Sequence, residues 1–197
     1  MSKESPEVQE LFNRIAKCKY RAVKFNGIGF RFVGLKYANE DDLLSGAGAG
    51  YVGGRWNPRG TNVINASLDP VTATKETYQE LIKDGFKSEF FKPRVMVSIQ
   101  LNVHDLFDLT DAKNRRKIGF PLSELIQEDW HSIQDSGEES WTQAIGRGCL
   151  VAGFNGLIVP SARNPKEGKN IAIFCHNNTP GCPLNIIEKE NLPLLPP

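Results

Sequence analysis

The chain has 197 residues, and 24 lysines and arginines against 23 aspartates and glutamates give it a formal net charge of +1. Nothing in such a balance suggests a polyanion binder that works through bulk electrostatics, so no direct nucleic-acid binding is expected. No apolar run approaches membrane-spanning length and the start of the chain is polar, which predicts a cytoplasmic protein without a membrane partner. The length fits one domain with short terminal additions.

An amphipathic helix is the first predicted element. Ser5 is a suitable cap, Pro6 fits the first helical position, and apolar residues follow at helical spacing. Residues 1–18 are therefore predicted to be a helical extension of a domain over 19–190. The Pro-rich residues 191–197 are predicted to be an extended tail.

Tyr20 to Phe25 is aromatic and β-branched enough to predict a strand, which would place Arg21 beside a sheet face or at the mouth of a cleft. For Arg21 two alternatives stay open, a salt bridge with the acidic run 40–42 and ligand binding. A second strand or hairpin is expected over 26–42. The glycine-rich segment 45–54 predicts a moving loop, either a lid over a site or a connection with no role.

Asn62 to Ala66 predicts a short strand, and the Asp69-Pro70 pair predicts a helix that runs to about Lys83 before Gly85. One stripe of this helix is expected to face the core: Val71, Thr74, Tyr78 and Leu81. Glu76 lies off that stripe. Periodicity leaves two readings for it, a solvated glutamate or a side chain that faces a cleft between this helix and the preceding loop.

In the C-terminal half, Pro93 to Leu101 alternates most clearly and predicts a core strand. A turn over 105–111 should lead to a short helix capped by Thr110, and 122–130 to another helical piece. A longer helix is expected over 138–152, with part of its buried face formed by Trp141, Ile145 and Cys149. Three short strands are then expected at 156–160, 170–174 and 184–187. Strands and helices without regular alternation predict a mixed α+β domain.

The four cysteines show no Cys-x-x-Cys pairing and are most simply reduced thiols. A metal site made of Cys175, His176 and Cys182 would fit no common zinc spacing, and no fourth ligand is evident. No metal is therefore expected.

The segment from Gly53 to Gly60 reads GGRWNPRG and holds two arginines, Arg55 and Arg59, between glycines and a proline. It is too rich in glycine for a helix interior and too broken for a core strand, so we expect a loop, named here the arginine loop. Guanidinium groups bind phosphate bidentately, and successive glycine amides can form an anion-binding concavity. The alternative is a surface loop with solvated arginines.

This loop and its surroundings resemble the RES domain family, which is named for its arginine, glutamate and serine. Three pieces of the chain match in the family's order: Tyr20–Val23, Ser45 through the arginine loop to Glu76, and Val159–Ala162 with Asn170 downstream. A run of eight matched loop residues is more specific than any lone motif. Because the family is related in fold to ADP-ribosyltransferases, the resemblance implies a single α+β domain of that kind.

Characterised members of the family look like toxins of toxin–antitoxin pairs that consume NAD or transfer its ADP-ribose. The resemblance therefore implies cleavage of the nicotinamide–ribose bond of NAD, as in a glycohydrolase or phosphorylase. An ADP-ribosyltransferase that modifies a protein, or a non-catalytic module that binds a nucleotide or an antitoxin, are the alternatives. The implied partners are NAD as substrate and a cognate antitoxin, with a homodimer left open.

Carried over by motif, Arg21 and Arg55 hold the phosphates, Glu76 stabilises the ribosyl cation and Ser161 orients nicotinamide or ribose. The catalytic set is thus Glu76, Arg55 and Ser161. From the residues alone, Ser161 reads as a turn residue after Pro160.

Where the family usually has a tyrosine, this chain has Asn65. We expect Asn65 in the substrate-binding set with Arg21 and Arg55, and a weakened activity because the aromatic ring is lost. Tyr51 is also placed in that set, since its ring could reach nicotinamide from the other side.

Overall fold

The computed structural model describes residues 5–83, 92–175 and 183–193. Its centre is a six-stranded sheet in the order β1-β2-β5-β4-β3-β6. The strands are β1 (Val23–Gly34), β2 (Val63–Ser67), β3 (Arg94–Asp108), β4 (Gly156–Pro160), β5 (Lys169–Phe174) and β6 (Leu184–Ile186). The described residues form the mixed α+β domain that the sequence predicts.

The long strand β1 pairs along its length with β3, with Val23 opposite Leu106 and Gly34 opposite Arg94. It also meets β2, where Phe30 lies opposite Ser67. Because β1 contacts both β2 and β3, the pairings close the sheet into a strongly bent ring. This closure brings the part of β1 around Phe30 next to Ser67 at the end of β2.

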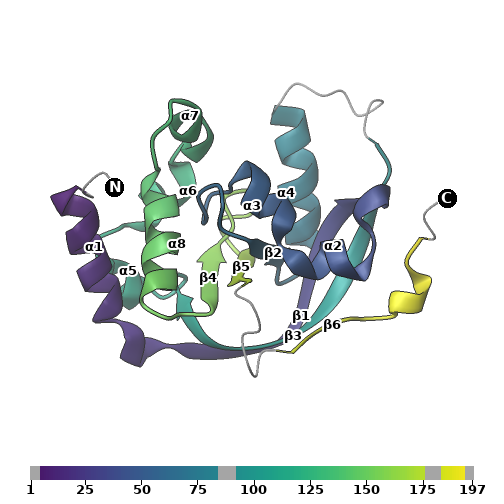
Figure 1. The fold of residues 1–197 in the computed structure, drawn as a ribbon, viewed down its shortest axis with the longest axis horizontal. Coiled ribbons are helices and arrows are strands. Elements are labelled where there is room, and N and C mark those ends of the chain that lie inside the picture. The colour runs from purple at the N-terminus through teal and green to yellow at the C-terminus, as the bar shows by residue number, and fades with distance from the viewer. Residues whose placement is uncertain (1–4, 84–91, 176–182, 194–197) are drawn as a thin grey trace.

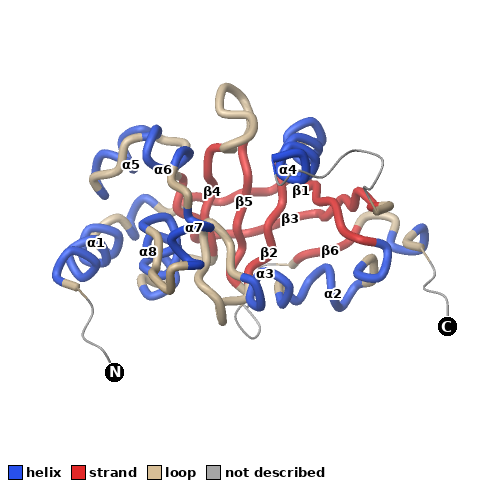
Figure 2. Tube along the Cα trace, turned by 90° about the horizontal axis from the view of Figure 1, so that it is seen from above, coloured by secondary structure: helices blue, strands red, loops and turns tan. Residues whose placement is uncertain are grey.

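Eight α-helices surround the sheet in the described chain (Figure 1). They are α1 (Pro6–Ala16), α2 (Glu40–Ser45), α3 (Ala47–Val52), α4 (Pro70–Lys83), α5 (Ala112–Ile118), α6 (Leu122–Gln127), α7 (Trp130–Asp135) and α8 (Trp141–Val151). Figure 2 shows α1 and α5–α8 gathered at one end of the sheet and α2–α4 at the other. Two hydrophobic cores lie on opposite faces of the sheet, because alternate residues of β2, β4 and β5 belong to different cores.

Helix α1 confirms the predicted amphipathic helix. Ser5 caps it by accepting a hydrogen bond from the amide of Val8. The buried side chains of Leu11, Phe12 and Ile15 belong to the core under α8. Burial of three such side chains contributes roughly 1.5–3 kcal/mol each, which anchors the helix to the domain.

The N-terminal strand predictions are corrected in two places. Residues 19–21 form a 3-10 turn, so the strand begins at Val23 and Arg21 precedes it. The strand or hairpin expected over 26–42 is instead the continuation of β1, followed by α2. The side chain of Asn39 caps α2 by accepting a hydrogen bond from the amide of Asp42. This cap stabilises a helix at 40–45 where a strand was predicted.

The glycine-rich segment 45–54, predicted to be a moving loop, is mostly helical, because α3 covers Ala47–Val52 within it. Gly46, at φ +65°, ends α2 and begins α3 in a left-handed conformation. Gly50 packs so tightly that a Cβ there would lie 2.0 Å from Oδ1 of Asn62. The glycines therefore permit close packing, which the sequence pattern alone does not distinguish from mobility.

Helix α4 has the predicted bounds, but a different face is buried. Val71 is 59% exposed, while Thr72 and Ala73 are buried. The hydroxyl of Thr72 accepts a hydrogen bond from the side-chain Nδ2 of Asn164 at 3.0 Å, so polar contacts with the loop after β4 contribute to the helix orientation. The side chain of Leu81, and Gly85, lie outside the described residues.

In the C-terminal half β3 extends to Asp108, and Asp111 rather than Thr110 caps α5. The single piece expected over 122–130 is two helices, α6 and α7, because Glu128 is extended. Helix α8 begins at Trp141 behind a capping box of Ser140 and Gln143. Ile145 and Cys149 are buried as predicted, but Trp141 is 41% exposed.

Candidate functional site

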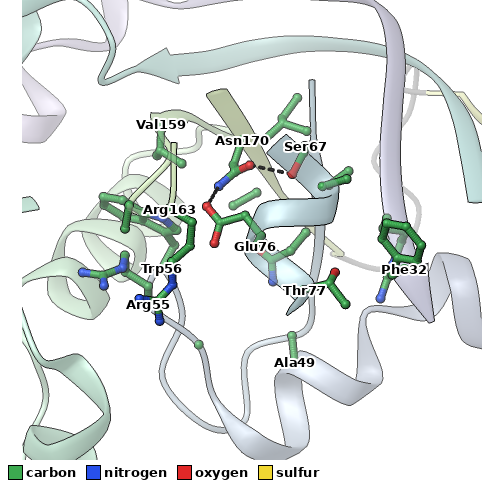
Figure 3. Close-up of a pocket in the computed structure, with 18 of the residues that line it drawn as sticks. Phe32, Ala49, Arg55, Trp56, Ser67, Glu76, Thr77, Val159, Arg163 and Asn170 are labelled. Atoms are coloured by element: carbon green, nitrogen blue, oxygen red, sulfur yellow. Dashed lines mark hydrogen bonds between the residues drawn. The ribbon is translucent and has the colours of Figure 1, made fainter. Parts of the chain in front are cut away.

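A cleft of about 620 Å³ lies between α3, α4, the arginine loop and the ends of β1, β2 and β5 (Figure 3). Among the described residues, one glutamate and four arginines line the cleft: Glu76, Arg31, Arg55, Arg94 and Arg163. Aromatic rings complete it: Phe30, Phe32, Trp56 and Trp130. A cationic cleft with flat apolar surfaces suits a ligand that carries both phosphates and aromatic bases.

Two neutral donors hold the carboxylate of Glu76. Its Oε1 accepts from the hydroxyl of Ser161 at 2.6 Å and from Nδ2 of Asn170 at 2.7 Å. Glu76 comes from α4, whereas Ser161 follows β4 and Asn170 lies on β5, so three elements fix one oxygen atom. Figure 3 shows the other carboxylate oxygen directed into the cleft.

The direction of these hydrogen bonds is determined by the groups behind them. The hydroxyl of Ser67 donates to Oδ1 of Asn170 at 2.8 Å, so the amide nitrogen of Asn170 faces Glu76. Oγ of Ser161 accepts from the amides of Arg163 and Asn164, at 3.1 and 2.9 Å, and its own proton therefore goes to Glu76. Both donors to the carboxylate are thus oriented before any ligand binds.

Ser161 is 0% exposed and does not line the cleft. It follows the buried strand β4, as predicted, but its hydroxyl contacts Glu76 and backbone amides. In this structure the contact that Ser161 makes in the site is with the carboxylate of Glu76. The turn function that the residue alone suggests is present too, because two amides of the next turn bond to it.

Buried amide side chains hold the arginine loop. Nδ2 of Asn57, which is 0% exposed, donates to the carbonyls of Ala49 and Thr61. Nε2 of Gln134 donates to the carbonyl of Val52, and Nε2 of Gln143 donates to that of Gly54. The loop is consequently a fixed part of the cleft wall.

Helix α8 also touches the loop closely. A Cβ on Gly146 would lie 1.8 Å from the carbonyl oxygen of Trp56, so only glycine allows this approach. Nη1 of Arg55 donates to the carbonyls of Leu125 and Glu128, at 3.0 and 3.1 Å. Arg55 thus reaches the cleft with its guanidinium already oriented, while Arg59 is exposed and does not line it.

Arg21 lies outside the cleft. Its guanidinium bonds to Oδ1 of Asn114 and forms an ion pair with Asp111 at 2.9 Å. The amide of Lys113, and after it Arg21, hold the pKa of Asp111 below its usual range. Of the two alternatives for Arg21, the structure contains the ion pair, but with an acid near α5 and not with the run 40–42.

Asn65 lines the cleft from the exposed face of β2, and it is therefore brought together with Glu76 and Arg55. Tyr51 is not: it is 86% exposed on α3 and is absent from the lining, although Ala49 and Val52 of the same helix are part of it. In the helix, the side chain of Tyr51 lies on a different face from those of Ala49 and Val52. The prediction of a loop over 45–54 contains no such face.

Sequence reasoning missed Phe30, Phe32 and Arg163. The two phenylalanines are two residues apart in β1 and therefore share one face of the strand, a period-2 signal in the sequence beyond residue 25. Tyr78 of α4 packs edge-on against Phe32, with ring centroids 5.5 Å apart. No sequence signal marked Arg163, because its position depends on the turn after Ser161.

Arg31 has a structural anchor: its Nη1 donates to the carbonyl of Leu43 at 3.1 Å, and burial lowers its pKa. The described residues contain no group of three or more His, Cys, Asp or Glu side chains that could hold a metal ion. Burial raises the pKa of Cys175 to about 11. His176 and Cys182, the other members of the weighed metal set, lie outside the described residues.

Fold and cleft together define an α+β domain with an arginine-lined cleft around one fixed carboxylate. The chain belongs to the RES domain family, whose model matches residues 14–195. A similar solved structure is a chain in the crystal structure of the M. tuberculosis MbcT–MbcA toxin–antitoxin complex. It is 22% identical, with a TM-score of 0.69, over 93% of this chain and 97% of that chain. This likeness shows the fold alone.

No curated protein matches the sequence. Among the described helices, none has both the length and the apolar composition needed to cross a membrane.

Proposed function

We propose that this protein is the toxin of a toxin–antitoxin pair and that it cleaves the nicotinamide–ribose bond of NAD in the cytoplasm. One observation carries the proposal. Glu76 is the single carboxylate among the described residues of a cationic, aromatic cleft, and two oriented donors hold one of its oxygens. Membership of the RES family supports the same function.

The reaction needs little from the protein besides positioning and electrostatic stabilisation. The C–N bond breaks with its electron pair going to the nicotinamide ring, which leaves as a neutral molecule and requires no proton. Positive charge then develops on the ribose, and the cleft-facing oxygen of Glu76 is placed to stabilise it and to accept hydrogen bonds from ribose hydroxyls. A water molecule that adds to the ribosyl carbon and loses a proton gives ADP-ribose.

The substitution Glu76→Gln tests this proposal. Glutamine keeps an oxygen for Ser161 and Asn170 but removes the charge, so nicotinamide release should fall by about 100- to 1,000-fold. The matched control is Glu167→Gln, the same change at an exposed residue of the loop after β4 that does not line the cleft. Its rate should equal that of the parent. Turnover by Glu76→Gln at the parent rate would remove Glu76 from the mechanism.

We also propose a cognate antitoxin as the partner, which the toxin–antitoxin title of the structural neighbour supports. Expression of the parent without a partner should slow the growth of a bacterial host through loss of NAD. Cells that express Glu76→Gln at the same level should grow normally. Equal toxicity of the two proteins would mean that harm comes from binding and not from catalysis.

A further inference from the structure

Two arginines lie with Trp56 on the same side of Glu76, and Phe32 lies on the opposite side (Figure 3). One is Arg55 of the arginine loop, and the other is Arg163, two residues after Ser161. The family resemblance implies a pair of arginines at the phosphates, but Arg21, the second of that pair, forms an ion pair with Asp111 outside the cleft. The cleft therefore holds an arginine, Arg163, that lies outside the pieces of the chain matched to the family motif.

The backbone of Arg163 is tied to the catalytic carboxylate through one atom. Its amide donates to Oγ of Ser161 at 3.1 Å, and that hydroxyl donates to Oε1 of Glu76 at 2.6 Å. The place where the Arg163 side chain begins is thus fixed relative to Glu76.

Within the part of the chain that the structure describes, no acidic group pairs with the charge of Arg163. Its side chain is half-buried in the cleft lining, and the described residues give it no carboxylate and no hydrogen-bond acceptor. Arg55 differs, since two backbone carbonyls occupy its Nη1. A half-buried guanidinium with all its donors available is a ready group for a bidentate anion.

We propose that Arg163 binds the diphosphate of NAD and is the second arginine of the substrate clamp; this inference rests on the proposed function. In NAD the diphosphate is joined to the reacting ribose through one CH₂–O link, so a group that binds it must lie close to the carboxylate that serves the ribose. Arg163 meets this requirement because Ser161 links its backbone to Glu76.

The experiment compares parent, Arg163→Ala, Arg163→Lys and a control, Lys166→Ala, which changes an exposed cation on the same loop outside the cleft lining. Two substrates are used: NAD, and nicotinamide riboside, which has the same scissile bond but no phosphate. For NAD, Arg163→Ala should lower kcat/KM by about 10- to 100-fold, mainly through KM, because a charge-assisted contact is lost. Lysine should restore only part of it, and nicotinamide riboside should not distinguish parent from variant.

Calorimetric titration with ADP-ribose tests the same contact without turnover. Arg163→Ala should bind ADP-ribose about 10- to 100-fold more weakly than the parent and the Lys166→Ala control. Equal affinities, or no binding to the parent, would overturn the assignment of Arg163. A parent that binds ADP-ribose through Arg163 but releases no nicotinamide from NAD would support the anion site and refute the proposed reaction.

Discussion

The two walls of the cleft hold their charged groups in different ways. On the carboxylate wall, Ser161 and Asn170 donate directly to the oxygen of Glu76. On the arginine-loop wall, the buried side chains of Asn57 and Gln143 bind backbone carbonyls, so the loop is fixed and Arg55 extends from it. The contacts of the first wall act on the charged oxygen of Glu76 itself, and those of the second wall fix the backbone from which Arg55 extends.

Substitutions behind the two walls should therefore affect different properties of the protein. A change behind Glu76 alters the hydrogen bonds of the group that meets the ribosyl cation, so it affects catalysis directly. A change behind the arginine loop displaces packed backbone, so it affects folding stability and catalysis together. Two substitutions separate the two effects, and two further substitutions test the cleft lining and α3.

The largest effect is expected for Ser161→Ala. Glu76 loses a charge-assisted hydrogen bond, which is worth about 1.5–3 kcal/mol, so nicotinamide release should fall by roughly 10- to 100-fold. The amides of Arg163 and Asn164 also lose their acceptor, and thermal unfolding measured beside the rate reports that cost. Ser136→Ala, at an exposed serine, is the control. A rate loss explained entirely by the unfolded fraction would contradict the direct effect on Glu76.

Gly146→Ala tests the other wall. The new methyl group would overlap the carbonyl of Trp56, so the loop or the helix must move, at a cost of about 1–3 kcal/mol in the free energy of unfolding. Denaturant unfolding measures this loss, and NAD turnover should fall with it as Arg55 shifts. Val151→Ala, at an exposed position of the same helix, should change neither. Full stability of Gly146→Ala would show that α8 does not hold the loop.

Asn65→Tyr should increase turnover. Asn65 lies in the cleft lining, so a ring at this position would reach the same space as Glu76. Aromatic stacking is worth about 0.5–1.5 kcal/mol beyond burial, which corresponds to at most about tenfold in rate or affinity. Tyr51→Ala, at an exposed ring outside the lining, should leave NAD turnover unchanged. A slower enzyme after Asn65→Tyr would mean that asparagine makes a polar contact that the ring cannot replace.

The smallest effect is expected for Gly48→Ala in α3. This glycine is exposed, and an added Cβ would meet nothing within 4 Å, so alanine should stabilise the helix by roughly 0.5–1 kcal/mol. The change in melting temperature measures it, and NAD turnover should not change. Slower turnover in the stabilised variant would show that residues 45–54 must move during the reaction, as the sequence suggests for this segment.

Much of the secondary structure could be predicted from local signals. The Ser5-Pro6 cap, the Asp69-Pro70 start of α4 and the apolar alternation of β3 depend on neighbouring residues, and the structure agrees with them. Boundaries failed where distant contacts decide. Gly50 lies in a helix because α3 packs on Asn62, a contact that no local pattern contains.

Local patterns suffice to predict a mixed α+β domain of the RES family that carries Glu76, Arg55 and Asn65, because these positions belong to a contiguous motif and its immediate neighbours. Which other residues meet them depends on how distant segments pack. The closure of β1 on β2 brings Phe30 to the cleft, and the ion pair with Asp111 removes Arg21 from it. Hydrogen bonds and ion pairs between distant segments depend on three-dimensional proximity, which a one-dimensional pattern does not encode.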